Sequence, residues 1–194
     1  MQNIRSPHQL RWGKMKFGKI NLAIASLAAV VFSFISHEFA HWIMGELLGY
    51  DMVMTLNTGF PKTSRWNEME DYMIVSAVGP IITLITSATI FFLIRFEGSK
   101  YWFTLLFSCF YLELLSGVLN FRNVNDLGRI SQYFNIGLFT LSVLFISIHG
   151  WLLSSTILNK KYSRAFVVQT LLWIVLFSSI WIMTNQKFKI ILIS

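Results

Sequence analysis

The chain has 194 residues, of which 55% are hydrophobic and 13% charged, and its mean hydropathy is +0.58. This composition indicates one domain whose solvent is lipid rather than water. The formal net charge of +7 does not point to nucleic acid, because Lys and Arg collect mostly at the ends of apolar runs, where lipid headgroups lie. The single cysteine, Cys109, cannot form an intrachain disulfide and is expected to face lipid or to pack.

A basic segment, residues 1 to 19, precedes five apolar runs, so we expect an all-α bundle of about five membrane-spanning helices. The opening lacks the pattern of a removable signal peptide, and the first run is expected to be a permanent span. The predicted spans are residues 20 to 48, 72 to 94, 101 to 119, a fourth that opens from the polar segment 120 to 130 and ends near 156, and 165 to 184. Residues 20 to 156 form the predicted core of about four helices, and residues 157 to 194 hold a basic loop, the fifth helix and a short tail.

The motif His37-Glu38-Phe39-Ala40-His41 lies toward the end of the first predicted span. Residues four apart on an α-helix are rotated by about 40°, so His37 and His41 present two imidazoles side by side to one ion. Glu38 is rotated by about 100° from His37, where its carboxylate can act as general base toward a water at that ion. Because such groups are costly in lipid, the pattern predicts two zinc ligands and a catalytic base. The alternative is a pair of hydrogen-bonded core histidines beside a snorkelling acid.

A hydrolytic zinc site needs a third protein ligand and an open position for water. Asp126 is the first candidate, because alternate crossing of five spans puts it on the same membrane face as the end of the first helix. The alternative is that Asn125 or Asp126 only caps the fourth helix. Glu113, within the third span, is expected to face the bundle as a structural hydrogen-bond acceptor, with a metal-ligand role as the alternative. Glu46 is interpreted as a rim acid on the far side of its helix, and His149 as a packing or interfacial histidine.

Two connecting features complete the prediction. Residues 50 to 56 are compatible with a short β-strand before the turn-forming Asn57-Thr58-Gly59, although these residues alone favour the alternative of an ordinary loop. An exposed strand edge there would bind an extended substrate by main-chain pairing. Gly79-Pro80 interrupts the second span, so we expect either a kinked helix or a short re-entrant turn.

With these motifs in place, the chain resembles the site-2 protease family of intramembrane zinc metalloproteases over residues 20 to 150. The family has a His-Glu-x-x-His helix, then an Ala-Gly-Pro-like break in a span, then an Asn-rich turn leading into Leu-Asp-Gly-Gly. The matching stretches here are His37 to His41, Ser76-Ala77-Val78-Gly79-Pro80, and Asn120 through Asp126-Leu127-Gly128-Arg129-Ile130. The resemblance implies that His37, His41 and Asp126 hold zinc while Glu38 activates water.

The chain departs from the family pattern at three points. Asn125-Asp126-Leu127-Gly128 stands where the family has Leu-Asp-Gly-Gly, the prolines of the turn are absent, and the polar residue after Gly-Pro is represented by Thr83. These differences affect the third ligand and the substrate-binding region. The histidine helix keeps the full motif.

The predicted function is hydrolysis of a peptide bond in or beside a transmembrane segment of a membrane protein or membrane peptide, with Zn²⁺ as cofactor and Glu38 as general base. The alternative is a non-catalytic metal-binding membrane protein, or a degenerate protease that acts as an interaction module. We expect a multi-pass protein of the cell membrane whose partners are the substrate and the bilayer, and no nucleic acid; the oligomeric state stays open. Ten Lys and Arg on the N-terminal face against six on the face with the site favour a cytoplasmic N-terminus. The family resemblance implies the opposite, a site nearer the cytoplasm.

Overall fold

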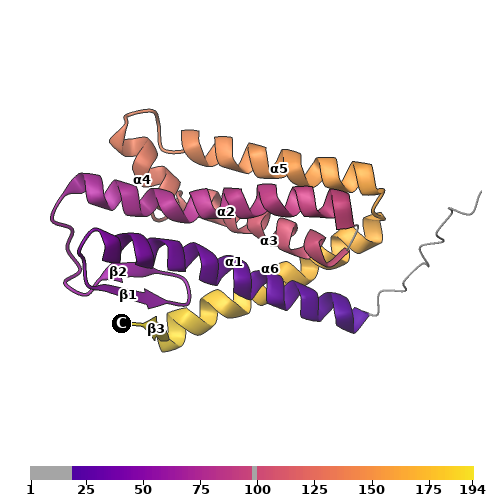
Figure 1. Ribbon diagram of the computed structural model, residues 1–194, viewed down its shortest axis with the longest axis horizontal. Coiled ribbons are helices and arrows are strands. Elements are labelled where there is room, and N and C mark those ends of the chain that lie inside the picture. Colours follow the sequence, from indigo (N-terminus) through magenta and orange to yellow (C-terminus); the bar gives the residue numbers. More distant parts are fainter. Residues whose placement is uncertain (1–18, 98–99) are drawn as a thin grey trace, which may run out of the picture.

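Five long helices dominate the computed structural model, which describes residues 19–97 and 100–194 (Figure 1). The elements in chain order are α1 (Lys19–Leu47), β1 (Met52–Thr55), β2 (Gly59–Pro61), α2 (Met69–Glu97), α3 (Lys100–Leu119), α4 (Asp126–Tyr133), α5 (Thr140–Lys160), α6 (Arg164–Phe188) and β3 (Ile191–Ile193). Every helix except α4 is long and apolar enough to cross a membrane, as predicted. The basic segment predicted for residues 1 to 19 lies outside the described residues except for its last residue.

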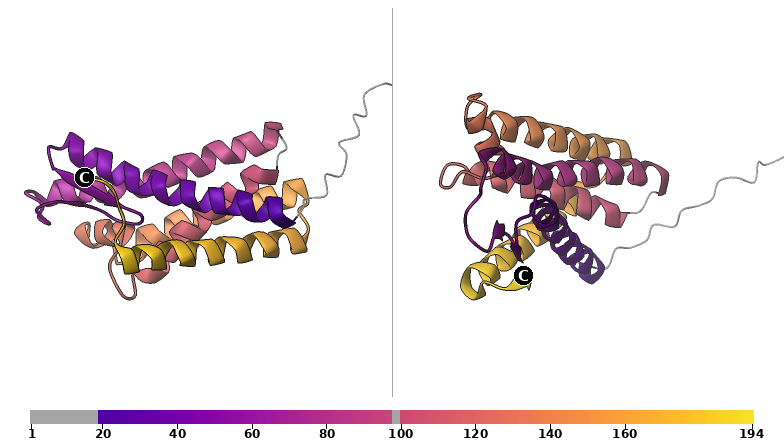
Figure 2. Two further views of the ribbon diagram at one scale, coloured as in Figure 1. Left: turned by 90° about the horizontal axis from the view of Figure 1, so that it is seen from below. Right: turned by 60° about the vertical axis from the view of Figure 1, so that its left-hand side comes forward.

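The helices form a bundle in which α1, α2 and α3 pack on one another (Figures 1 and 2). Helix α5 lies against α2 and α3, and α6 crosses the bundle diagonally, packing on α3 and α1. Aromatic and branched side chains fill the centre, among them Val30, Ile94, Phe103, Leu106 and Ile174, each at most 1% exposed. Large apolar side chains also cover the outside of all five long helices. That distribution suits a surface in contact with lipid, where apolar burial does not drive helices together.

The prediction of a single helix for the fourth span is wrong, because this part of the chain forms two helices. The short α4 ends at Tyr133, and α5 begins at Thr140. Between them Asn135 and Gly137 have φ angles of 54° and 93°, left-handed values that end a helix. Helix α4 has a polar face, so a position at the membrane surface spares its charged groups the cost of entering lipid.

The second span runs through Gly79-Pro80 as one helix, so of the two predicted alternatives the re-entrant turn is wrong. Pro80 lies inside helix α2 and is almost fully buried within the bundle. A proline at this point removes one helical hydrogen bond, which a membrane helix tolerates where neighbouring protein covers the backbone.

The strand after the first span is present, and the alternative of an ordinary loop is wrong. β1 forms an antiparallel hairpin with β2, in which Met54 pairs with Gly59, and β1 pairs on its other side with β3 near the C-terminus. The order β2-β1-β3 makes β1 the central strand, so the sheet edges belong to β2 and β3. No sequence pattern predicted β3, whose pairing depends on α6 ending beside the hairpin.

Two α6 side chains hold the hairpin turn. Trp181 donates from Nε1 to the carbonyl of Leu56 at 2.8 Å, and Asn185 donates to Oγ1 of Thr55 and to the side chain of Asn57. The sheet, α4 and the C-terminus therefore lie at one end of the bundle, and the start of α1 and the α5–α6 turn lie at the other (Figure 1). The end with the sheet is called the sheet end below.

This arrangement predicts that the hairpin and the α5–α6 turn lie on opposite sides of the membrane. Thr63→Cys and Asn159→Cys, each in a Cys109→Ala background, place one exposed thiol at each end. A membrane-impermeant maleimide applied to sealed vesicles of one orientation should label one variant and not the other. Labelling of both from the same side would mean that one of the three long helices between these positions, α2, α3 or α5, does not cross.

Candidate metal centre

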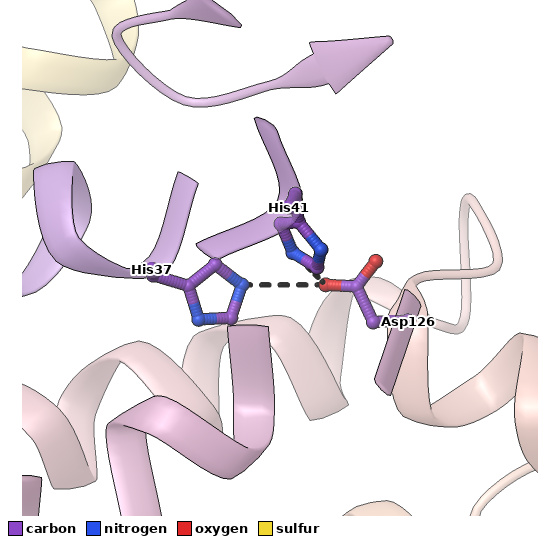
Figure 3. A group of neighbouring side chains, drawn as sticks. All are labelled: His37, His41 and Asp126. Atoms are coloured by element: carbon purple, nitrogen blue, oxygen red, sulfur yellow. Dashed lines mark hydrogen bonds and ion pairs between the residues drawn. The ribbon is translucent and has the colours of Figure 1, made fainter. Parts of the chain in front are cut away.

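Two histidines of α1 and one aspartate of α4 meet at the sheet end of the bundle (Figure 3). Oδ2 of Asp126 lies 3.3 Å from Nε2 of His37 and 3.4 Å from Nε2 of His41. The three potential ligand atoms all lie within 4.8 Å of one another. Both histidines are buried, at 6% and 5% exposure. The fold thus brings together the three residues that were predicted to hold a metal.

The other nitrogen of each imidazole is bound by helix α2. His41 donates from Nδ1 to the backbone carbonyl of Val75 at 2.6 Å, which can only accept. Thr83 donates its hydroxyl proton to the carbonyl of Gly79 at 3.0 Å, so its oxygen accepts from Nδ1 of His37, also at 3.0 Å. In the neutral imidazoles both Nε2 atoms then carry lone pairs that point at the Asp126 carboxylate.

Three electron-pair donors facing one another repel unless a positive charge lies between them. Two imidazole nitrogens and one carboxylate oxygen are a donor set suited to zinc, with a fourth position left over. When protons on the imidazoles supply this positive charge instead, they stabilise the ionised carboxylate of Asp126. Burial alone would raise the pKa of its carboxyl, but His41 and the hydrogen bonds from both imidazoles hold that pKa well below its ordinary value.

Gly79 leaves the space that an ion would occupy. A Cβ built on this residue would lie 2.8 Å from Nε2 of His37 and closer still to Nε2 of His41. Any side chain at this position would therefore collide with both Nε2 nitrogens. The residues present fit a small metal ion, and the glycine of the Gly-Pro pair serves the site rather than a break in the helix.

The approach to Asp126 is built by two asparagines. The backbone N–H of Asn125 donates to Oδ1 of Asn120 at 2.6 Å, and the Asn125 side chain donates to the carbonyl of Ser116 at 3.0 Å. Gly128 lets α4 approach, because a Cβ there would lie 2.5 Å from Asn120 Oδ1. Asn125 occupies the N-cap position, but its side chain makes no capping hydrogen bond. The side-chain cap considered for Asn125 or Asp126 is thus absent, and Asp126 faces the histidines instead.

The other candidate residues lie outside the cluster. Glu113 faces the bundle as expected, 2% exposed, and one of its carboxylate oxygens has no hydrogen-bond partner among the described residues. Glu46 accepts from the backbone N–H of Met52 at 2.9 Å, which joins α1 to the sheet. His149 is fully buried on α5 and donates to the carbonyl of Phe145 at 2.8 Å, in keeping with a packing role.

Glu38 shares a cavity of about 260 Å³ with the three cluster residues. Only 7% of Glu38 is exposed, so the cavity is its outlet toward water or a ligand. The residues that line the cavity are of both kinds. The apolar ones include Phe34, Leu112, Leu115, Leu119 and Ile182, and the polar or aromatic ones include Asn57, Thr58, Trp66, Tyr72, Ser76 and Arg129.

Several residues of the site were not identified from the sequence. The Val75 carbonyl carries no sequence signal, because every residue has one. Arg129, which pairs with Asp126 at 3.0 Å, was detectable from its i,i+3 spacing on a helix. The role of Thr83 as partner of His37 depends on the packing of α2 against α1.

Gly79→Ala should abolish metal binding while leaving the fold intact, because alanine favours helix but its methyl group takes the space between the imidazoles. Gly150→Ala is the matched control, since a Cβ there meets only Phe110 at an ordinary 3.5 Å. Metal content of the purified variants and helical circular dichroism check both parts. Full metal content in Gly79→Ala would show that the ion does not lie between the histidines.

Comparisons with protein-family models, with curated proteins and with solved structures give no match to this chain.

Proposed function

We propose that this protein is a zinc-dependent intramembrane peptidase, similar in its centre to the site-2 proteases. The observation that carries the proposal is the convergence of two imidazole lone pairs and one carboxylate oxygen beside Glu38 in a cavity. A structural zinc site has four protein ligands, whereas three protein ligands next to a cavity are typical of a catalytic one. This ligand count favours a peptidase over a purely structural metal centre.

A zinc ion held by His37, His41 and Asp126 would act as a Lewis acid, lowering the pKa of water and polarising a carbonyl. Glu38 follows His37 directly and lies in the same cavity, so it can take a proton from the attacking water and pass it to the leaving amine. The α2 groups that hold both Nδ1 atoms keep the imidazoles in the tautomer that presents Nε2. The buried setting strengthens each of these electrostatic interactions.

The substrate is proposed to enter as an extended chain along β2. The backbone N–H of Thr55 donates to the carbonyl of Thr58, and the N–H of Lys62 donates to the carbonyl of Asp51. In this register the backbone N–H and C=O groups of residues 58, 60 and 62 point toward β1. The N–H and C=O of Gly59 therefore point to the outer edge of β2. Gly59 also lies against His41, because a Cβ on Gly59 would be 3.3 Å from Cβ of His41. Main-chain pairing there would carry a substrate past the metal centre.

Glu38→Gln should retain the fold and the metal but lose peptide hydrolysis by several orders of magnitude, because an amide cannot accept the proton. The measurement is mass-spectrometric mapping of new peptide termini in membranes that contain wild-type or variant protein. Glu113→Gln is the matched control, since it neutralises another buried acid of the bundle. Wild-type cleavage by Glu38→Gln would remove Glu38 from the mechanism.

Asp126→Ala should weaken zinc binding about 10-fold or more, because it removes one of three ligands, whereas Glu113→Ala should leave the affinity unchanged. Zinc affinity is measured by competition with a chelating dye on purified protein. Weakened binding in Glu113→Ala with normal binding in Asp126→Ala would transfer the third ligand to Glu113.

A further inference from the structure

The two oxygens of the Asp126 carboxylate have different partners. Oδ2 faces Nε2 of His37 and of His41, at 3.3 and 3.4 Å. Oδ1 accepts a hydrogen bond from Nη1 of Arg129 at 3.0 Å. The guanidinium of Arg129 is thus hydrogen-bonded to the carboxylate oxygen that the histidines do not face.

The guanidinium of Arg129 also interacts with three other groups. Nη1 also donates to Oγ of Ser76 on α2 at 3.0 Å, and Nε donates to the carbonyl of Val124 at 3.3 Å. The guanidinium carbon lies 5.1 Å from the centre of the Tyr72 ring, a stacking distance for a cation on an aromatic face. The side chain is 29% exposed and bridges α4 to α2 at the rim of the cavity. A planar fork with several fixed acceptors has little freedom to turn away from Oδ1.

We infer that Arg129 is a positioning residue that reserves Oδ1 of Asp126 and so limits this carboxylate to a single metal-binding oxygen. The inference rests on the proposed function and deepens it. A carboxylate can bind a metal through one oxygen or through two. If Oδ1 were released, it could bind the ion together with Oδ2 and raise the number of ligand atoms, water included, from four to five, which would crowd the position that a catalytic centre keeps open for water.

Metal affinity alone does not measure this role. Removing Arg129 frees Asp126 to move, which weakens binding, but it also removes a positive charge beside a cation, which strengthens binding. The two effects oppose each other. The number of ligand atoms around the ion responds only to the release of Oδ1.

The test therefore uses Co²⁺ in place of Zn²⁺ on the purified full-length protein and records its visible absorption. Four-coordinate Co²⁺ absorbs much more strongly than five- or six-coordinate Co²⁺. Wild-type protein should give the strong band, Arg129→Met a several-fold weaker band, and Arg129→Lys, which restores a donor to Oδ1, the strong band again. Arg122→Met is the control, because Arg122 is an exposed arginine on the loop before α4.

Ser76→Ala provides a second variant that leaves Arg129 in place and removes one of its anchors, and it should weaken the band less than Arg129→Met. A wild-type band in both Arg129→Met and Ser76→Ala would overturn the inference, as would an equal loss in Arg122→Met. Failure of the proposed function looks different. In that case wild-type protein would show no band that depends on His37, whatever residue 129 is.

Discussion

The central physical constraint is the cost of placing two imidazoles and a carboxylate together inside an apolar bundle. Each Nδ1 is already bound to helix α2, so the remaining lone pairs of His37 and His41 face the charge of Asp126. Lone pairs that face one another in this way need a positive charge between them, from protons or from a metal ion, since unpaired buried polar atoms cost roughly 2 to 7 kcal/mol each by transfer measurements. The surrounding helices hold the three side chains around a common point, and the proposed zinc chemistry uses the positive charge at that point.

Helices α1, α2 and α4 each contribute different groups to the candidate metal centre. Helix α1 supplies both imidazoles and Glu38, and the short helix α4 supplies Asp126 at the sheet end of the bundle. Helix α2 provides no proposed ligand, yet it orients both imidazoles, and its Gly79 leaves the space beside both Nε2 atoms free of a side chain. The sheet covers the same end, tied to α6 through Trp181 and Asn185. A site divided in this way lies within membrane-crossing helices while its cavity is lined partly by polar groups of the sheet end.

The position of α4 explains why the fourth predicted span is divided. A single helix from residue 126 onward would carry Asp126 and Arg129 along one continuous span, where both charges would have to be satisfied in lipid. The turn at Asn135 and Gly137 separates a short polar helix from the apolar α5. The aspartate can then approach the histidines laterally, with Asn120 and Asn125 fixing the entry to α4.

Much of the centre followed from local spacing. Hydropathy determined the number of long helices, and the helical repeat determined that His37 and His41 share a face, because both properties depend on neighbouring residues. Asp126 was predicted as the residue that would join them, from the alternate crossing of spans and from motif resemblance. Packing alone decided which atoms meet: His41 with the Val75 carbonyl 34 residues away, His37 with Thr83 46 residues away, and β3 with β1. Backbone carbonyls, the space left by a glycine and strand partners distant in the chain have no residue-type signature, so only the tertiary structure could assign them.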